Sequence, residues 1–119
     1  MVVIINQISD RNEFDTILNE NEGVVILKFG ATWCKPCKLI TPFVSKIIDT
    51  LADSYTVYDL DIDDNFEIFA YLKSKRMLSG VPSMLAYKKG NVSFAPNELV
   101  SGTVQTSYRD FFIRCGTLT

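Results

Sequence analysis

Short apolar runs alternate along the chain with longer stretches in which apolar residues recur every three or four positions. The runs VVIINQI at 2–8, VVILKF at 24–29 and YTVYDLDI at 55–62 are typical of strands. The run at 24–29 is almost uninterrupted, as expected for a central strand that is covered on both faces. Because the stretches between these runs have helical spacing, the three strands are predicted to pair in parallel.

Helical periodicity appears in four stretches of the chain. Ser9 or Asp10 can cap the first helix, which ends by Gly23, and a second helix is predicted to begin at Cys34. Pro42 lies inside the second helix, removes one backbone donor and crowds the carbonyl four residues earlier, so a kink is predicted near Lys38 rather than two separate helices. The apolar positions assigned to these helices are Phe14, Ile17 and Leu18, then Leu39, Ile40, Phe43, Val44, Ile47, Ile48 and Leu51, then those within 65–75, and finally Val104, Tyr108, Phe111, Phe112 and Cys115.

The segment between the third and fourth helices has the pattern of a hairpin. After Pro82, SMLAYKKGNVSF at 83–94 predicts two antiparallel strands around a turn at Lys89 and Gly90. The complete order is therefore βαβαβαββα, an α/β fold in which a mixed sheet of five strands is flanked by four helices. No linker or repeat interrupts this order, so residues 1–119 are predicted to form a single domain.

Composition and charge narrow the functional classes. Hydrophobic residues make up 47% of the chain, which is typical of a folded protein rather than a disordered one. The formal net charge of −2 provides no basic surface for nucleic acid or anionic lipid. The start, MVVIINQISDRN, has neither a positively charged leader nor a long apolar run, so we expect no signal peptide, no membrane span and a reducing, cytoplasmic location.

The counts of cysteine and histidine restrict the chemistry further. The chain has three cysteines and no histidine. A secreted disulfide framework normally needs an even set of cysteines, and a mononuclear zinc site needs about four Cys or His ligands. One chain can build neither, and in a reducing compartment a CxxC pair more often serves redox or metal chemistry than structural stapling. Redox chemistry is therefore the leading interpretation.

The CxxC pair, Cys34 and Cys37, falls on the first turn of the predicted second helix. Residues three apart share a helix face, so the two sulfurs can close a small ring. The unpaired amides and the dipole of a helix N-terminus favour an anion, which should lower the pKa of the Cys34 thiol below its usual ~8.5. Lys35 and Lys38 add positive charge nearby, and Pro36 fits the first turn because it needs no intrahelical donor.

Together with other local motifs, this pair resembles the active site of the thioredoxin family. The matching segments are ATWCKPCK at 31–38, the downstream Pro42, GVPS at 80–83 and YKKG at 87–90. The resemblance extends from Val2 to about Cys115, and it implies the thioredoxin fold. It also implies a thiol-disulfide oxidoreductase that reduces or exchanges protein disulfides.

The resemblance implies roles for individual residues. Cys34 would be the exposed nucleophile that attacks a substrate disulfide, and Cys37 would be the more buried thiol that resolves the mixed disulfide. Pro82 is similar to the family's cis-proline, beside which the Val81 backbone would pair with an extended substrate segment. The other residues expected to line the substrate groove are Trp33, Lys35, Pro36, Ser101 and Gly102.

The resemblance also implies how the pair is recharged. No bound cofactor or metal is expected, because electrons would come from NADPH through a flavoprotein similar to thioredoxin reductase. The expected partners are this reductase and disulfide-containing protein substrates, without nucleic acid or membrane. The chain is expected to act as a monomer.

Two departures from the family's usual pattern affect the pair and its surroundings. Lys35-Pro36 replaces the usual Gly-Pro between the cysteines, which should stabilise the thiolate and make the pair somewhat more oxidising. Gly30 stands where a second aromatic residue is common, and the loop at 94–99 is longer than usual. The partner surface is therefore expected to differ from that of other members.

A third departure is an exchange of charges. The family usually has an aspartate where the central strand here has Lys28, and a lysine where the next strand here has Asp59. Because an isolated buried charge is unfavourable, we predict that Lys28 and Asp59 form a buried pair beneath Cys37. Asp59 would then handle the proton during resolution.

Simpler interpretations compete for several residues. Lys28 could instead extend its ammonium group to water, Trp33 could fill the core, and Pro82 could be an ordinary first residue of a strand. Cys115 lies on an apolar stripe and is predicted to be a buried, inert thiol. The acidic residues are predicted to form a solvated strand end rather than a cation site, and they are Asp59, Asp61, Asp63 and Asp64.

Three other functions are compatible with the sequence. A glutaredoxin-like oxidoreductase would be recharged by glutathione. A redox-independent binding or assembly subunit would use the loop at 94–99 and would not need its cysteines. A metal or iron–sulfur carrier would require two chains that each contribute a CxxC pair.

Overall fold

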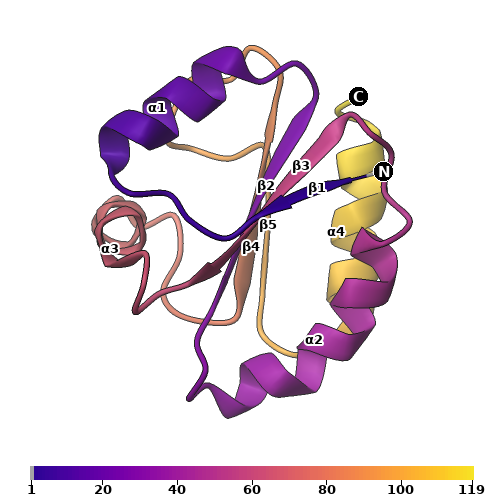
Figure 1. Cartoon of the computed structure of the whole chain (residues 1–119). Coiled ribbons are helices and arrows are strands. Elements are labelled where there is room, and N and C mark those ends of the chain that lie inside the picture. The colour runs from indigo at the N-terminus through magenta and orange to yellow at the C-terminus, as the bar shows by residue number, and fades with distance from the viewer. Residues whose placement is uncertain (1) are drawn as a thin grey trace.

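A computed structural model describes residues 2–119, which form one five-stranded sheet with helices on both faces (Figure 1). In chain order the elements are β1 (Val3–Ile5), α1 (Arg11–Glu20), β2 (Val24–Gly30), α2 (Lys35–Ile48), β3 (Tyr55–Asp61), α3 (Phe66–Ser74), β4 (Ser83–Lys88), β5 (Glu98–Ser101) and α4 (Gln105–Gly116). The predicted order of strands and helices is confirmed.

The strand order in the sheet is β1-β3-β2-β4-β5, so β2 lies at its centre. β1 and β2 both run parallel to β3, as predicted, whereas β4 is antiparallel to β2 and β5 is antiparallel to β4. The register pairs Phe29, near the end of β2, with Ser83, the first residue of β4. The end of β2 and the start of β4 therefore meet at one edge of the sheet.

The central strand separates two apolar clusters, which explains its almost continuous apolar sequence. Leu27 and Phe29 belong to the cluster covered by α1 and α3, and Val24 and Ile26 belong to the cluster covered by α2 and α4 (Figure 1). Side chains alternate across a strand, so a strand covered on both sides is apolar at nearly every position. Each fully buried side chain of this size contributes roughly 1.5–3 kcal/mol to stability.

The first two helices begin where the sequence predicts. The Asp10 carboxylate accepts a hydrogen bond from the Glu13 amide (2.8 Å), and the Glu13 carboxylate accepts one from the Ser9 amide (3.1 Å), an arrangement that satisfies free donors at the start of α1. α2 is one helix that begins after Cys34 and contains Pro42, and its ribbon changes direction along its length (Figure 1). Pro42 has no amide to donate to the carbonyl four residues earlier, which accounts for the bend.

β1 is shorter than predicted because the chain leaves the sheet after Ile5. Ile8 is buried, but its amide donates to the Asn65 side-chain oxygen, at the start of α3, over 2.8 Å. The Asn65 side-chain nitrogen donates in turn to the Asn6 carbonyl (3.3 Å). These long-range contacts replace the strand, and apolar periodicity does not reveal them.

The prediction of a second hairpin strand directly after the turn is wrong. The turn at Lys89 and Gly90 is present, and Gly90 has a φ of 89°, which favours glycine. The chain then forms a loop over residues 91–97, and the partner of β4 is the later strand β5. The loop predicted at 94–99 therefore includes the first residues of β5.

Asparagine side chains organise this loop. Asn97 donates its amide to the Ala86 carbonyl over 2.8 Å, and its side-chain oxygen accepts a hydrogen bond from the Lys88 amide over 2.9 Å. The Asn91 side-chain nitrogen donates to the same Asn97 oxygen (2.8 Å). Side-chain bonds of this kind compete with strand pairing, which is why the β-like sequence at 91–94 is not a strand.

Three apolar positions assigned to the helices are exposed, and one of them is Phe66, at the first residue of α3. Leu39 is 70% exposed on the outer side of α2, because the buried stripe of that helix runs through Cys37, Ile40 and Val44. Val104 is exposed at the N-cap of α4. The buried residues of α4 are Tyr108, Phe111, Phe112 and Cys115, as predicted.

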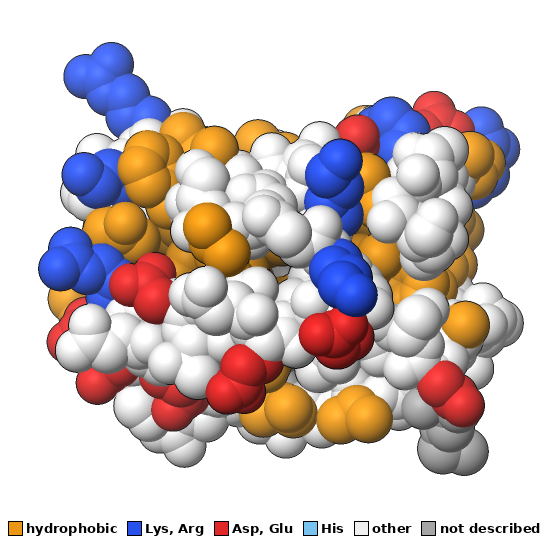
Figure 2. Space-filling model, turned by 90° about the horizontal axis from the view of Figure 1, so that it is seen from above, with side chains coloured by type: hydrophobic (Ala, Val, Ile, Leu, Met, Phe, Trp, Pro, Cys, Tyr) orange, Lys and Arg blue, Asp and Glu red, His pale blue; other side chains and the backbone are white. Residues whose placement is uncertain are grey.

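Charged side chains of both signs are mixed on the surface. On the face seen in Figure 2, Lys and Arg side chains lie beside Asp and Glu side chains in several places. Independently of that view, Lys89 forms an ion pair of 2.7 Å with Glu22. Within residues 2–119, no helix combines the length and apolar character needed to cross a membrane.

Candidate active site

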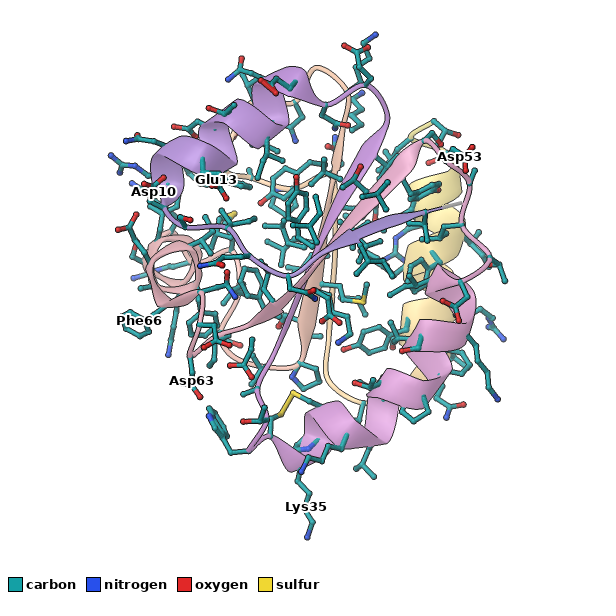
Figure 3. All side chains as sticks on the ribbon, viewed as in Figure 1. Asp10, Glu13, Lys35, Asp53, Asp63 and Phe66 are labelled. Atoms are coloured by element: carbon teal, nitrogen blue, oxygen red, sulfur yellow. A yellow bond between two sulfur atoms is a disulfide. The ribbon has the colours of Figure 1, made fainter. Side chains whose placement is uncertain are left out.

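Cys34 and Cys37 form a disulfide at the N-terminus of α2, just beyond the end of the central strand (Figure 3). Cys34 is the N-cap residue of the helix, and the two Cα atoms are 5.3 Å apart. The Cys37 amide donates a hydrogen bond to Cys34 Sγ over 3.1 Å. The predicted position of the pair is confirmed, and the amide that bonds this sulfur would also stabilise a thiolate there.

The exposure of the two cysteines differs from the expectation. In this disulfide-bonded form Cys34 is 3% exposed and Cys37 is 6% exposed. The expected contrast between an exposed Cys34 and a more buried Cys37 is therefore wrong for this form. The physical reason is that Cys34 caps the helix, so its sulfur is turned toward the Cys37 amide rather than toward solvent.

The Asp61 carboxylate ties the loop between β2 and α2 to the end of β3. One of its oxygens accepts a hydrogen bond from the Thr32 amide (3.1 Å), and the other accepts one from the Asp63 amide (2.9 Å). The Trp33 indole donates to the Asp63 carboxylate over 2.9 Å. Asp63 and Asp64 are exposed, as predicted for a solvated strand end, but Asp61 and Asp63 also hold the loop that precedes the disulfide.

Three exposed residues surround the buried sulfurs. Trp33 is 64% exposed and therefore does not fill the core. Pro36 is exposed on the first turn of α2, and the Lys35 side chain points away from the molecule into solvent (Figure 3). An aromatic ring, a proline ring and a cation thus lie next to the disulfide.

The Val81–Pro82 peptide bond is cis, as expected for this position. Pro82 directly precedes Ser83, which pairs with Phe29 on one side and with Ser101 on the other. This register places Val81 and Pro82 at the sheet edge where β2 leads into the cysteine loop. Segments far apart in sequence therefore meet beside the disulfide.

Hydrogen bonds fix the Pro82 segment to α4. The Pro82 carbonyl accepts a hydrogen bond from the Gly102 amide over 3.2 Å, and the Gly102 carbonyl accepts one from the Tyr108 hydroxyl over 2.8 Å. Gly102 has a φ of 90°, a conformation that favours glycine. In the part of the chain that the structure describes, the Val81 amide and carbonyl have no hydrogen-bond partner. The amide is free to donate a hydrogen bond to an incoming strand, and the carbonyl is free to accept one.

Lys28 and Asp59 form the predicted ion pair, with 3.2 Å between Nζ and the nearer carboxylate oxygen. They are neighbours in the register of β2 and β3, which explains why they meet. The Lys28 side chain is 14% exposed and that of Asp59 is 48% exposed. The pair exists, but the prediction that both charges are buried is wrong, because the Asp59 carboxylate opens into a cleft.

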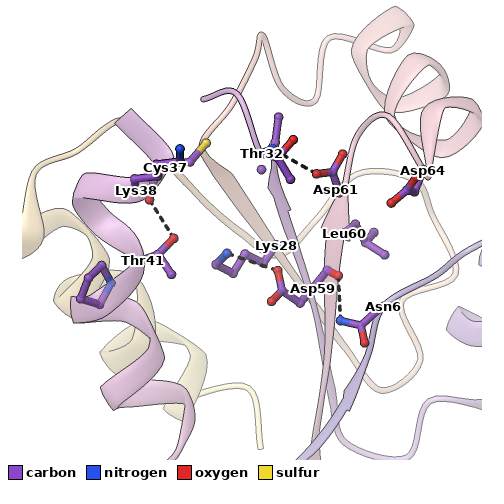
Figure 4. A pocket seen from close by; sticks show the side chains of 13 residues that line it. Asn6, Lys28, Thr32, Cys37, Lys38, Thr41, Asp59, Leu60, Asp61 and Asp64 are labelled. Atoms are coloured by element: carbon purple, nitrogen blue, oxygen red, sulfur yellow. Dashed lines mark hydrogen bonds and ion pairs between the residues drawn. The ribbon is translucent and has the colours of Figure 1, made fainter. Parts of the chain in front are cut away.

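This cleft lies between α2 and β3 and has a volume of about 610 Å³ (Figure 4). Its lining includes Lys28, Asp59, Gly30 and Cys37. The ion pair and the second cysteine of the disulfide therefore share one solvent-accessible space, in agreement with the predicted position of the pair beneath Cys37.

Comparison with known proteins supports this interpretation of the site. The family model named Thioredoxin matches residues 5–110. The chain belongs to the thioredoxin family. Thioredoxin-2 of Saccharomyces cerevisiae is 31% identical over 87 residues, which cover 73% of this chain and 79% of the yeast protein. Thioredoxin of Bacillus subtilis is 32% identical over 89 residues, which cover 71% of this chain and 82% of that protein.

Solved structures agree with the family assignment. The structure of Plasmodium falciparum thioredoxin matches with a TM-score of 0.70 at 25% identity, and the match covers 92% of this chain and 98% of that one. The predicted thioredoxin fold is therefore confirmed. With a disulfide-bonded cysteine pair at this position, this thioredoxin-family protein is a thiol-disulfide oxidoreductase.

Cys115 lies outside this thioredoxin-family site. It is fully buried on α4, and burial, aided by the Glu98 carboxylate, raises the pKa of its thiol to about 12. A thiol with so high a pKa carries little thiolate at neutral pH and is a poor nucleophile. The predicted burial of Cys115 is confirmed. No group of three or more Cys, His, Asp or Glu residues between positions 2 and 119 is arranged to hold a metal ion.

The supporting role of three polar residues at the thioredoxin-family site was not predicted. They are Asp61, Asp63 and Asn65, and Asn65 is buried with its side-chain nitrogen donating to the Asp61 carbonyl over 3.0 Å. Their position at the end of β3 or just after it was the available signal, because the carboxyl ends of two neighbouring parallel strands lie side by side. Their specific hydrogen bonds depend on loop geometry that spacing does not define.

Proposed function

We propose that this chain reduces protein disulfides by thiol–disulfide exchange, with Cys34 as the attacking thiolate and Cys37 as the resolving thiol. The observation that carries the proposal is the Cys34–Cys37 disulfide at the N-terminus of α2. With their Cα atoms 5.3 Å apart, the two residues lie within the usual range for a disulfide, so the bond can open and close with little backbone movement. Each cycle transfers two electrons to one substrate disulfide.

The helix position of Cys34 supports the attacking role. A thiolate at the N-cap is stabilised by the Cys37 amide, which already points at this sulfur, and by the helix dipole. Lys38 adds positive charge on the first turn, whereas Lys35 extends into solvent and contributes less (Figure 3). Cys37 needs only to be close when the mixed disulfide has formed, and it lies on the same turn.

A substrate segment would dock on the surface formed by Trp33, Val81 and Pro82. The Val81 amide and carbonyl can each make one hydrogen bond with an extended segment, and the exposed indole supplies apolar contact. The residues that complete this proposed surface are Lys35, Pro36, Ser101 and Gly102.

Asp59 is proposed to accept the Cys37 proton during resolution. Its carboxylate opens into the cleft that Cys37 lines, and the Lys28 ammonium holds it there over 3.2 Å. Asp59→Asn should therefore slow the release of a chromophoric thiol from a Cys34 mixed disulfide by about 10²-fold, measured by stopped flow. Asp64→Asn is the matched control because Asp64 lines the same cleft. An unchanged release rate in Asp59→Asn would show that Asp59 has no such role.

The source of electrons and the setting belong to the same proposal. Family membership supports recharging by NADPH through a thioredoxin reductase-like flavoprotein. The chain, residues 1–119, would act as a single monomeric domain on disulfide-containing proteins, without nucleic acid or membrane. A reducing compartment such as the cytoplasm would keep the pair available as a dithiol.

The proposal is tested by reduction of insulin with dithiothreitol as the electron source. Cys34→Ser should abolish catalysis, and Cys37→Ser should instead accumulate a mixed disulfide between Cys34 and the substrate. Cys115→Ser is the control, since this buried thiol lies outside the site, and it should retain turnover. Full turnover by Cys34→Ser would refute the proposal, and a partner bound equally well by the double cysteine variant would favour a redox-independent binding role.

A further inference from the structure

Only one of the two cysteines lines the cleft between α2 and β3. Cys37 belongs to its lining and Cys34 does not (Figure 4). Gly30 also lines the cleft, and a Cβ atom added to it would lie 3.7 Å from Cys37 Sγ. This distance is an ordinary van der Waals contact, so a methyl group fits at residue 30, whereas a larger side chain there would extend over this sulfur.

The size and charge of the cleft suit a small molecule. Its volume of about 610 Å³ is within the range of small-ligand sites. Lys28 and Asp59 neutralise each other, whereas Lys38 and Asp64 also line the cleft and have no ion-pair partner within residues 2–119. One free cation and one free carboxylate match a ligand that carries both a carboxylate and an amine.

We propose that this cleft is a second entrance to the disulfide, through which a small zwitterionic thiol reaches Cys37. The proposal rests on the proposed function, because it uses the same redox pair. Protein substrates meet Cys34 from the side of Trp33 and Val81, and the small thiol meets Cys37 from the side of Gly30. The two entrances lie on different segments of the site.

The chemistry of the exchange favours attack at Cys37. The incoming thiolate forms a bond to Cys37 Sγ, the Cys34–Cys37 bond breaks, and Cys34 leaves as a thiolate. Cys34 is the better leaving group because its sulfur accepts the Cys37 amide at the helix N-terminus (3.1 Å), and a thiol of lower pKa leaves faster. Access and leaving-group ability therefore favour the same sulfur.

A second molecule of the thiol completes the reaction. Its thiolate attacks the ligand sulfur of the mixed disulfide, which releases the oxidised ligand as a disulfide and leaves Cys37 as a thiolate that takes up one proton. Two thiols are oxidised and the protein disulfide is reduced, so two electrons are transferred in all. The protein dithiol produced is the form that reduces protein disulfides.

The reverse of this second step provides the test. In Cys34→Ser, cystine is added as the zwitterionic probe, and mass spectrometry of peptides measures mixed-disulfide formation at Cys37 and at the buried Cys115. Cys37 should react at least about tenfold faster than Cys115, and adding Gly30→Phe should slow the Cys37 reaction about tenfold. Gly30→Ala is the matched control and should have a much smaller effect.

Two outcomes would overturn the proposal. One is a Cys37 rate no greater than that of Cys115. The other is an equal effect of Gly30→Phe on Cys34 in the Cys37→Ser background, which would indicate a general distortion of the site.

If Gly30→Phe does not fold, a second comparison replaces it. The rate at which cystine reacts with Cys37 in Cys34→Ser is compared with the rate for a bulky peptide disulfide, and equal rates would contradict a cleft of limited size. Failure of the wild-type protein to reduce insulin would instead count against the proposed function.

Discussion

Removal of the Asp61 carboxylate should destabilise the protein and loosen the loop that carries the cysteines. This carboxylate accepts the amides of Thr32 (3.1 Å) and Asp63 (2.9 Å), so it joins the end of β3 to the segment just before Cys34. Asp61→Ala removes both acceptors and leaves two backbone donors without their partners. The change is local, because the strand that ends at Asp61 keeps its pairing with β2.

The expected loss follows from the two hydrogen bonds. A hydrogen bond to a charged group contributes about 1.5–3 kcal/mol, and the lower end applies because Asp61 is partly exposed and water can replace part of the interaction. Asp61→Ala should therefore lower the free energy of unfolding by about 3 kcal/mol. Asp61→Asn retains one acceptor oxygen and should lose about half as much.

Urea unfolding of the oxidised protein at neutral pH measures this loss. Asp64→Ala is the matched control. It removes the same charge three residues further along the chain, and the Asp64 carboxylate has no hydrogen bond to the loop. This substitution should change stability by less than about 0.5 kcal/mol. If Asp61→Ala and Asp64→Ala lost the same amount, the hydrogen bonds of Asp61 would contribute nothing beyond its charge and the reasoning would fail.

Three further predictions concern single side chains. Lys35→Gln removes a charge near the Cys34 thiolate and should lower the reduction potential by about 5–20 mV in glutathione buffers, whereas an increase would contradict the electrostatic argument. Burial raises the pKa of Cys115 to about 12, so its stabilising effect is complete below the usual thiol pKa and is lost as pH rises toward 12. Urea unfolding between pH 8 and 11 should therefore show a steeper loss in wild type than in Cys115→Ala, and parallel curves would refute this. Trp33→Ala should lower kcat/KM for insulin reduction about tenfold, because the exposed indole supplies apolar contact, and an unchanged value would exclude Trp33 from the docking surface.

The sequence predicts elements best where burial on both sides leaves a strong pattern. β2 and α2 are predicted almost to their ends, because one is almost continuously apolar and the other has an apolar stripe that follows the cysteine pair. The strand predicted at 91–94 failed because Asn91 and Asn97 hold that segment as a loop, and β-like composition does not show such contacts. The end of β1 at Ile5 was mispredicted for the same reason, because side-chain hydrogen bonds of asparagine replace strand pairing there.

The predicted site depended on motifs rather than on periodicity. The disulfide and the cis bond before Pro82 were anticipated because local motifs identify them. The pairing of Lys28 with Asp59 followed from charge balance, but the exposure of Asp59 did not, since it depends on how α2 is placed over β3. The cleft beside Gly30 could not be predicted, because it requires the side chains of distant segments to leave one space unfilled.

The free amide and carbonyl of Val81 have a consequence for selectivity. Two backbone hydrogen bonds contribute about 1–3 kcal/mol in total, whereas even millimolar affinity requires about 4 kcal/mol. A docked segment would therefore be held only briefly until a covalent bond to sulfur forms. Neither hydrogen bond involves a side chain of the substrate, so the amino acids around the substrate disulfide would have little effect on binding. Competition among substrate proteins would instead depend on how easily each disulfide is reduced and how often it is exposed.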